Sequence, residues 1–165
     1  AVEMHLNART KLMESGYESY EISNYAKPGL YSKHNSAYWD RTPYMGVGPS
    51  AHSFDGKSRR WNVSSIDAYL KAVSQGTNYF ESESITPIDY FNELIMLGLR
   101  TNKGVAIEVL ENAIMQSQRR LFESTIQKHI RLKNIIIENG YCKLTVGGQL
   151  LSNVVIEDLM LQTDQ

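Results

Sequence analysis

The chain has 165 residues, 42% of them hydrophobic and 21% charged, which is enough for one domain or two small ones. Its net charge of −1 excludes a general electrostatic attraction to nucleic acid or to an acidic membrane. The single cysteine, Cys142, excludes an intramolecular disulfide framework and indicates a reducing, cytoplasmic setting. No apolar run is long enough to span a membrane, and the N-terminus lacks the layout of a signal peptide. The chain opens in helical spacing without an initiator Met, so we expect it to be part of a longer protein.

The first predicted elements are a helix and a strand. Residues 2–15 have the spacing of an amphipathic helix that Gly16 would end, because glycine suits the left-handed position after a helix. Residues 17–23 alternate as a strand that places Glu21 on its polar face. The order helix, glycine, strand favours a parallel sheet or a barrel. We expect Glu21 to pair with a Lys or Arg of a neighbouring strand rather than to act as a general acid or base.

A long loop and a second strand follow. Residues 24–43 read as a loop with a short helix near residues 35–39, and loops of this length are more often functional than incidental. Residues 44–54 are predicted to form one strand with two distinct faces. One face would meet helices and carries Met45, Val47, Pro49 and Ala51. The other face would give a ligand or another backbone close approach and carries Gly46, Gly48, Ser50 and His52.

The remainder is predicted to be mainly helical. Ser64 or Ser65 would cap a helix that Gly76 ends, and a polar linker of residues 77–84 would lead to a helix of residues 86–100. Further helices are predicted at residues 107–116, 121–138 and 153–161. A β-hairpin is predicted from residues 141–146 and 149–152, joined by Gly147 and Gly148. Helix, helix, hairpin and helix in this order resemble a winged-helix arrangement.

Five motifs in a fixed order carry a family resemblance. They are YEISNYAKPG, HNSAYW, YMGVGPSAHS, the Arg60-x-Asn62 pair and the MLGLR of residues 96–100. Together they resemble the C-terminal half of the oxygen-independent coproporphyrinogen III oxidases, a radical-SAM family, and within it the haem-chaperone branch. The resemblance implies an α/β fold class: residues 1–80 would be the C-terminal part of a partial (β/α) barrel, and residues 81–165 a winged-helix-like domain.

The resemblance also implies cofactors of the longer protein. The family holds a [4Fe–4S] cluster on three cysteines, with S-adenosylmethionine on the open iron. Cys142 alone cannot assemble that cluster, so we expect this chain to be catalytically inactive by itself. By motif position, Gly46, Gly48 and His52 would lie near S-adenosylmethionine. For His52, a buried histidine bonded to a backbone carbonyl is an equally good interpretation.

The haem interpretation depends mainly on His34, since a neutral imidazole is a standard axial ligand of haem iron. The motif that marks the haem-chaperone branch, His-Asn-x-x-Tyr-Trp, is matched by His34, Asn35, Tyr38 and Trp39. The rings of Tyr38 and Trp39 could cover a porphyrin face. The alternative is a surface histidine with an ordinary hydrogen-bonding role. The implied partners are haem or a porphyrinogen, and a protein that accepts haem.

Two other functions remain open at this stage. A true oxidase would decarboxylate the propionates of coproporphyrinogen III by radical chemistry. A nucleic-acid-binding winged helix is the weakest alternative, because the net charge is not basic and no cluster of basic residues marks a recognition helix. The basic side chains of this region are instead spread around its predicted helices: Arg119, Arg120, Lys128, Arg131 and Lys133.

Overall fold

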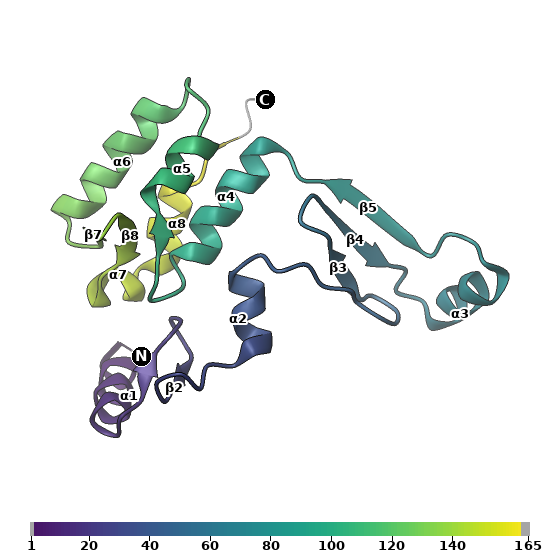
Figure 1. Ribbon diagram of the computed structural model, residues 1–165, viewed down its shortest axis with the longest axis horizontal. Coiled ribbons are helices and arrows are strands. Elements are labelled where there is room, and N and C mark those ends of the chain that lie inside the picture. The colour runs from purple at the N-terminus through teal and green to yellow at the C-terminus, as the bar shows by residue number, and fades with distance from the viewer. Residues whose placement is uncertain (1, 163–165) are drawn as a thin grey trace. The chain divides into compact units, whose positions relative to one another are not determined.

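A computed structural model describes residues 2–162, and Figure 1 shows its helices and strands. The chain forms two compact units. The second unit is Arg41–Thr86, and the first unit combines the residues before and after it. The predicted domain division into residues 1–80 and 81–165 stays a prediction. No helix of the described residues is long and apolar enough to cross a membrane.

The first unit begins with the predicted helix, α1 (Val2–Glu14). Gly16 adopts a φ of 79°, and the next amide, of Tyr17, donates to the Leu12 carbonyl at 3.0 Å. This left-handed closure confirms the helix end that glycine predicted. After it come β1 (Glu18–Ser19) and β2 (Tyr25–Ala26), which pair antiparallel.

The expectation of one continuous strand over residues 17–23 is therefore wrong. The chain reverses after Glu21, whose carboxylate accepts hydrogen bonds from the Ser23 amide at 2.5 Å and from the Asn24 side chain. A short side chain–backbone turn of this kind competes with a continuing strand. All strand pairs in the described part of the chain are antiparallel. The mixed α/β class is confirmed, and no closed barrel forms within residues 2–162.

Two helices frame the motifs of the first unit. The predicted short helix is α2 (Lys33–Trp39), whose cap is Ser32: its hydroxyl accepts a hydrogen bond from the Asn35 amide at 3.3 Å. The helix predicted from residue 86 is α4 (Pro87–Gly98), with proline at its first position as expected.

The rest of the first unit has the predicted winged-helix order. After α4 come β6 (Val105–Ala106), α5 (Ile107–Ala113), α6 (Arg119–Arg131), β7 (Ile135–Glu138), β8 (Tyr141–Leu144), α7 (Val146–Leu150) and α8 (Ser152–Leu159). The three strands form an antiparallel sheet in the order β6-β8-β7. Helix, strand, helix, helix and a two-stranded wing therefore follow one another (Figure 1).

The turn of the β-hairpin lies earlier in the chain than predicted. Strands β7 and β8 join at Asn139 and Gly140, with φ values of 52° and 79°, the left-handed pair that a tight hairpin turn requires. The helix predicted to run to residue 138 is thus too long, because the β-branched Ile135-Ile136-Ile137 run suits a strand. The predicted hairpin turn, Gly147-Gly148, lies instead in α7. There the Thr145 hydroxyl caps the helix by accepting from the Gly148 amide at 2.9 Å.

The hydrophobic core belongs to the winged-helix part. Helix α4 contributes Phe91 and Ile95, and Leu99 follows directly after its end; all three are almost completely buried. The rings of Phe91 and Phe122 meet edge to face, with centroids 5.1 Å apart. Helix α8 closes the core, and the residues buried there also include Leu110, Ile126, Ile135, Cys142, Val155 and Leu159.

A buried polar cluster joins α6 to α8. His129 is 2% exposed, and its Nε2 lies 3.0 Å from an Asp158 carboxylate oxygen. The Asn134 side-chain amide lies 3.1 Å from Nδ1. Both ring nitrogens are satisfied if Nε2 carries the proton, since the amide then donates to Nδ1. Lys128 pairs with the same carboxylate at 2.5 Å, so the buried histidine is fully partnered.

The second unit is a three-stranded antiparallel sheet with one helix. Strands β3 (His52–Phe54), β4 (Ser58–Asn62) and β5 (Phe80–Ser84) pair in chain order. Helix α3 (Ile66–Gln75) connects β4 to β5, with Ser65 as its cap and Gly76 at a φ of 63° after it, as predicted. The linker predicted over residues 77–84 is wrong, because β5 fills most of it.

The single strand predicted over residues 44–54 is also wrong. Tyr44 and Phe54 exchange two backbone hydrogen bonds of 2.8 and 2.9 Å, so the segment closes on itself as a loop. Gly48 and Ser50 reverse the chain with φ values of 101° and 58°, which a regular strand does not allow. The strict alternation is lost, and Met45, predicted to lie under a helix, is 73% exposed.

Candidate functional site

The first and last motifs of the resemblance meet in the first unit. The Ile22 amide donates to the Arg100 carbonyl at 2.9 Å, and the Asn102 amide donates to the Tyr20 carbonyl at 3.2 Å. Glu21 and Thr101 form the bridge between these two bonds. The YEISN segment is thus clamped to the end of α4, although about eighty residues separate them in the sequence.

Glu21 serves this turn. It is 4% exposed, and its carboxylate accepts hydrogen bonds from the Ser23 amide and the Asn24 side chain. The expected partner, a Lys or Arg of a neighbouring strand, is not among the contacts of Glu21 in the described chain. A buried carboxylate with two N–H donors is satisfied without a cation. Its role is to hold the reversal between β1 and β2.

Helix α2 is held against this clamp by its inner face. The Asn35 side chain donates to the Tyr20 hydroxyl at 3.1 Å, and the Tyr20 ring stacks on Tyr31 with centroids 5.0 Å apart. One turn later the Arg100 guanidinium lies 5.9 Å from the centre of the Trp39 ring. Because residues four apart share a helix face, Asn35 and Trp39 together fix the rotation of α2.

The outer face of α2 carries the other half of the motif. His34 and Tyr38 are both exposed and also four residues apart. Their rings meet edge on, with centroids 5.2 Å apart. No hydrogen bond to the His34 ring occurs among residues 2–162, so its nitrogens face solvent. The motif is therefore divided: Asn35 and Trp39 anchor the helix, whereas His34 and Tyr38 lie exposed on its other face.

Gly46, Gly48 and His52 lie in the second unit. A Cβ atom on Gly46 would meet the His52 carbonyl oxygen at 2.1 Å, so glycine is required there by the protein's own backbone. The Gly46 amide donates to the Ser53 hydroxyl at 2.9 Å, and the Asn62 side chain donates to the Gly48 carbonyl at 2.8 Å. These contacts explain both glycines and Asn62 as parts of one tight loop.

His52 itself is exposed rather than buried. Its ring lies beside Trp61, with centroids 6.4 Å apart. The alternative of a buried, carbonyl-bonded core histidine does not describe this position. A role of Gly46, Gly48 and His52 near S-adenosylmethionine stays a prediction, since it depends on chain outside this unit.

The residues present do not fit an iron–sulfur cluster. Cys142 lies fully buried in β8, and burial raises the pKa of its thiol to about 12. A cluster needs several thiolates, and this chain has one cysteine. Among residues 2–162, no three His, Cys, Asp or Glu side chains are grouped so that they could hold a metal ion.

Sequence reasoning missed two parts of this arrangement. Tyr20 and Arg100 were present in the motifs, but their contacts with Asn35 and Trp39 depend on folding that brings distant segments together. The second part is a hollow on one face of the β3–β4–β5 sheet, with Arg60 on its floor. The hollow can be inferred from the pairing of the strands, but only once β5 is recognised as a strand.

Comparisons with known proteins agree with the resemblance. Residues 85–151 match the family described as the HemN C-terminal domain. The chain is 33% identical to the "Heme chaperone HemW" of Lactococcus lactis, over 91% of this chain and 39% of that protein. It is 34% identical to the "Heme chaperone HemW" of Bacillus subtilis, over 93% of this chain and 41% of that protein. The chain thus spans about two fifths of these relatives.

Two further similarities extend the picture. The bovine mitochondrial "Radical S-adenosyl methionine domain-containing protein 1" is 33% identical over 64% of this chain and 26% of that protein. A solved structure of Escherichia coli coproporphyrinogen III oxidase (HemN), titled a radical SAM enzyme, matches with a TM-score of 0.69 at 15% identity. That match covers 94% of this chain and 39% of the HemN chain, and it confirms the fold. The chain is therefore similar to the C-terminal part of the HemN and HemW proteins, and its residues 85–151 match the HemN C-terminal domain.

Proposed function

We propose that the protein containing this chain is a haem chaperone, which binds haem and delivers it to a protein that requires it. The observation that carries the proposal is the division of α2, which exposes His34 beside Tyr38 on an anchored helix. Relatives named haem chaperones cover most of the chain and support the same function. The setting would be the cytoplasm, which the single cysteine favours.

His34 is the proposed axial ligand of haem iron. An imidazole that accepts no competing hydrogen bond and faces solvent can coordinate an arriving metal. Tyr38 lies against it edge on and would border the porphyrin. Trp39, expected from the sequence to cover the ring as well, lies on the inner face under Arg100. In the proposal, Asn35 and Trp39 position the helix, while His34 and Tyr38 contact haem.

The radical-SAM cofactors would come from the rest of the protein. Relatives whose names include S-adenosylmethionine are longer than this chain, which covers 26% of the bovine protein. In the proposal, the [4Fe–4S] cluster is held outside these 165 residues. Gly46, Gly48 and His52 would lie near S-adenosylmethionine, with the loop of Gly46 and Gly48 shaping one wall of its site.

Haem titration of the full-length protein tests the proposal. The wild type should give a Soret band of ligated haem, and His34→Ala should weaken haem binding by about tenfold or more, because coordination to iron is lost. His5→Ala on α1 is the matched control and should leave the titration unchanged. An unaltered Soret titration of the His34→Ala protein would remove His34 from the proposal.

A true oxidase is the alternative function. Its support from the HemN structure is a likeness of fold at 15% identity. An assay of the reconstituted full-length protein with coproporphyrinogen III distinguishes the two. Decarboxylation of the substrate would establish the oxidase, whereas haem transfer without turnover would support the chaperone.

A further inference from the structure

The second unit contains a hollow that none of the comparisons assigns. It measures about 590 Å³ and lies on one face of the β3–β4–β5 sheet. Small-molecule sites typically fall between about 300 and 1,000 Å³, so the size suits an organic ligand. We infer that this hollow binds a carboxylate of a flat, largely apolar ring, and that Arg60 receives the carboxylate. The inference rests on the proposed function, which supplies the ligand: a porphyrin with its propionates.

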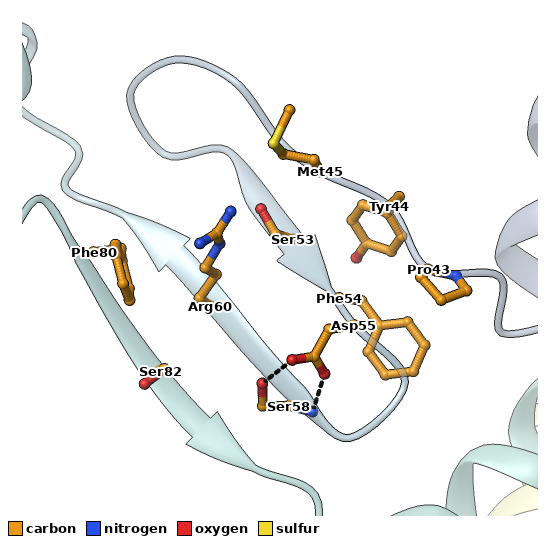
Figure 2. Close-up of a pocket in the computed structure, with 10 residues that line it drawn as sticks. All are labelled: Pro43, Tyr44, Met45, Ser53, Phe54, Asp55, Ser58, Arg60, Phe80 and Ser82. Carbon is orange, nitrogen blue, oxygen red and sulfur yellow. Dashed lines mark hydrogen bonds between the residues drawn. The ribbon is translucent and has the colours of Figure 1, made fainter. Parts of the chain in front are cut away.

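The sheet register places the polar floor of the hollow. Ser53 of β3 pairs with Arg60 of β4, and Arg60 pairs with Ser82 of β5. Directly paired residues project from the same face, so the guanidinium lies between two hydroxyls. Figure 2 shows Arg60 on the central strand with Ser53 on one side of it. The Ser53 hydroxyl accepts from the Gly46 amide, which leaves its proton free to donate.

Arg60 carries a charge that no acid of the described chain neutralises. Its guanidinium lies 5.1 Å from the centre of the Phe80 ring, and this is its contact in the described structure. The adjacent Arg59 projects from the opposite face and pairs with Glu83 at 3.6 Å. Stacking on an aromatic ring holds a guanidinium by its face and leaves its N–H edge free for a carboxylate. The two neighbouring arginines therefore differ in the property that anion binding needs.

The Phe80 ring forms the apolar border of the hollow beside Arg60 (Figure 2). Tyr44 and Phe54 also line the hollow, but Phe54 pairs with Arg59, so its ring projects from the opposite face of the sheet. Flat ligands gain from stacking or edge contacts with such rings. An inorganic anion would use Arg60 but not this border, so the hollow favours an aromatic acid over phosphate.

Asp55, an acidic residue that lines the hollow, determines the orientation of the ligand. The Asp55 carboxylate accepts hydrogen bonds from the Lys57 amide at 2.8 Å and from the Ser58 amide at 2.7 Å. These bonds, led by the Lys57 amide, hold the pKa of Asp55 below its ordinary value, so it stays ionised at neutral pH. A second negative charge is repelled at that end. The ligand's carboxylate is therefore directed to the Arg60 end.

Binding of iron-free protoporphyrin IX to the full-length protein tests the inference, followed by porphyrin fluorescence. Without iron, His34 has no metal to coordinate, so the titration reports on the ring and its propionates. Arg60→Gln should raise the dissociation constant about tenfold or more, since a hydrogen bond to a charged group is lost. Arg59→Gln, with the same charge change on the opposite face, should bind as the wild type does.

A ligand variant avoids any doubt about folding of the mutant. The dimethyl ester of protoporphyrin IX keeps the ring and removes the charges, and it should bind the wild type about tenfold more weakly. Equal binding of acid and ester, or of Arg60→Gln and wild type, would overturn the inference. If haem binding still depended on His34, the chaperone proposal would survive that result. Absence of both haem and porphyrin binding by the wild type would contradict both.

Discussion

The two units use glycine-rich and aromatic motifs in opposite ways. In the first unit, motifs about eighty residues apart are brought together: the YEISN turn is bonded to the end of α4, and both anchor α2. In the second unit, the YMGVGPSAHS motif is explained within itself, since Gly46 closes against His52 and Gly48 is clamped by Asn62. Similar-looking motifs can therefore report a tertiary junction in one place and a local loop in another.

The largest loss of stability should come from a glycine-to-alanine substitution whose added methyl group would overlap the backbone of another segment. Gly46→Ala would set a Cβ 2.1 Å from the His52 carbonyl oxygen, and neither backbone segment can move without opening the loop. We expect destabilisation on the order of 3 kcal/mol, confined to the second unit. Hydrogen exchange resolved by residue would show it as lost protection in β3 and β4 with α4 unchanged. Unchanged exchange in β3 would contradict the loop geometry.

The same test in the first unit has a built-in control. A Cβ on Gly148 would meet the Asn134 carbonyl oxygen at 2.0 Å, whereas on its neighbour Gly147 the nearest contact is 3.7 Å away. Gly148→Ala should cost on the order of 3 kcal/mol, while Gly147→Ala should be neutral or stabilising by up to about 1 kcal/mol, as alanine favours a helix. Denaturant unfolding of both variants measures the difference. Equal stabilities would show that α7 is not seated on Asn134.

A smaller effect is expected where α2 is anchored. Asn35→Ala removes the hydrogen bond to the Tyr20 hydroxyl and should cost about 1 kcal/mol. Asn7→Ala on the exposed face of α1 is the matched control, because it removes the same amide from a helix without breaking a side-chain hydrogen bond within residues 2–162. Exchange at the α2 amides should rise in the first variant and stay constant in the second. Faster exchange at the α2 amides in both variants would show that the lost hydrogen bond to Tyr20 is not the cause.

The buried histidine cluster should make the stability of the fold depend on pH in the acidic range. Lys128, and then His129, hold the pKa of Asp158 below its ordinary value of 3.8. Because the folded-state pKa is lowered, the stabilisation is present above pH 3.8 and is lost as the pH falls through the lowered value. Asp158→Asn should therefore be less stable than wild type at pH 7, and the gap should narrow at pH 3. Asp40→Asn, an exposed carboxylate, should show no such convergence in urea midpoints.

The smallest expected effect is on thiol chemistry. Burial raises the pKa of Cys142 to about 12, so almost no thiolate exists at neutral pH. The folded chain should react with a thiol reagent many times more slowly than the same chain in denaturant. Fast labelling of the folded protein would indicate that β8 opens readily.

The sequence predicted most helices because their signals are local. Gly16, Ser65 and Pro87 mark helix boundaries by their own backbone preferences, and the structure confirms those boundaries. Strand prediction failed where partners decide the outcome. Residues 44–54 alternate like a strand, yet Gly48 and Ser50 adopt positive φ and turn the chain back. The β7–β8 hairpin was misplaced because Asn139-Gly140 and Gly147-Gly148 are both suited to a tight turn, and only Asn139-Gly140 follows the β-branched run of β7.

The sequence predicted which residues belong to the candidate site but not how they are arranged in space. The sequence identified one motif of four residues: His34, Asn35, Tyr38 and Trp39. Their division between two helix faces depends on Tyr20 and Arg100, which are distant in sequence. Arg60 was noted only as part of a motif. Its unneutralised charge became apparent only when the register placed Arg59, and not Arg60, opposite Glu83.

The division of α2 also makes the proposed ligand position interchangeable. Because Asn35 and Trp39 hold the helix without help from position 34, a thioether or thiolate introduced there would be presented from the same backbone. His34→Met and His34→Cys should then give haem complexes with different absorption spectra on an unchanged scaffold. In the proposed haem complex, the four-residue spacing would separate the coordination of the iron from the stability of the fold, and either could be redesigned without the other.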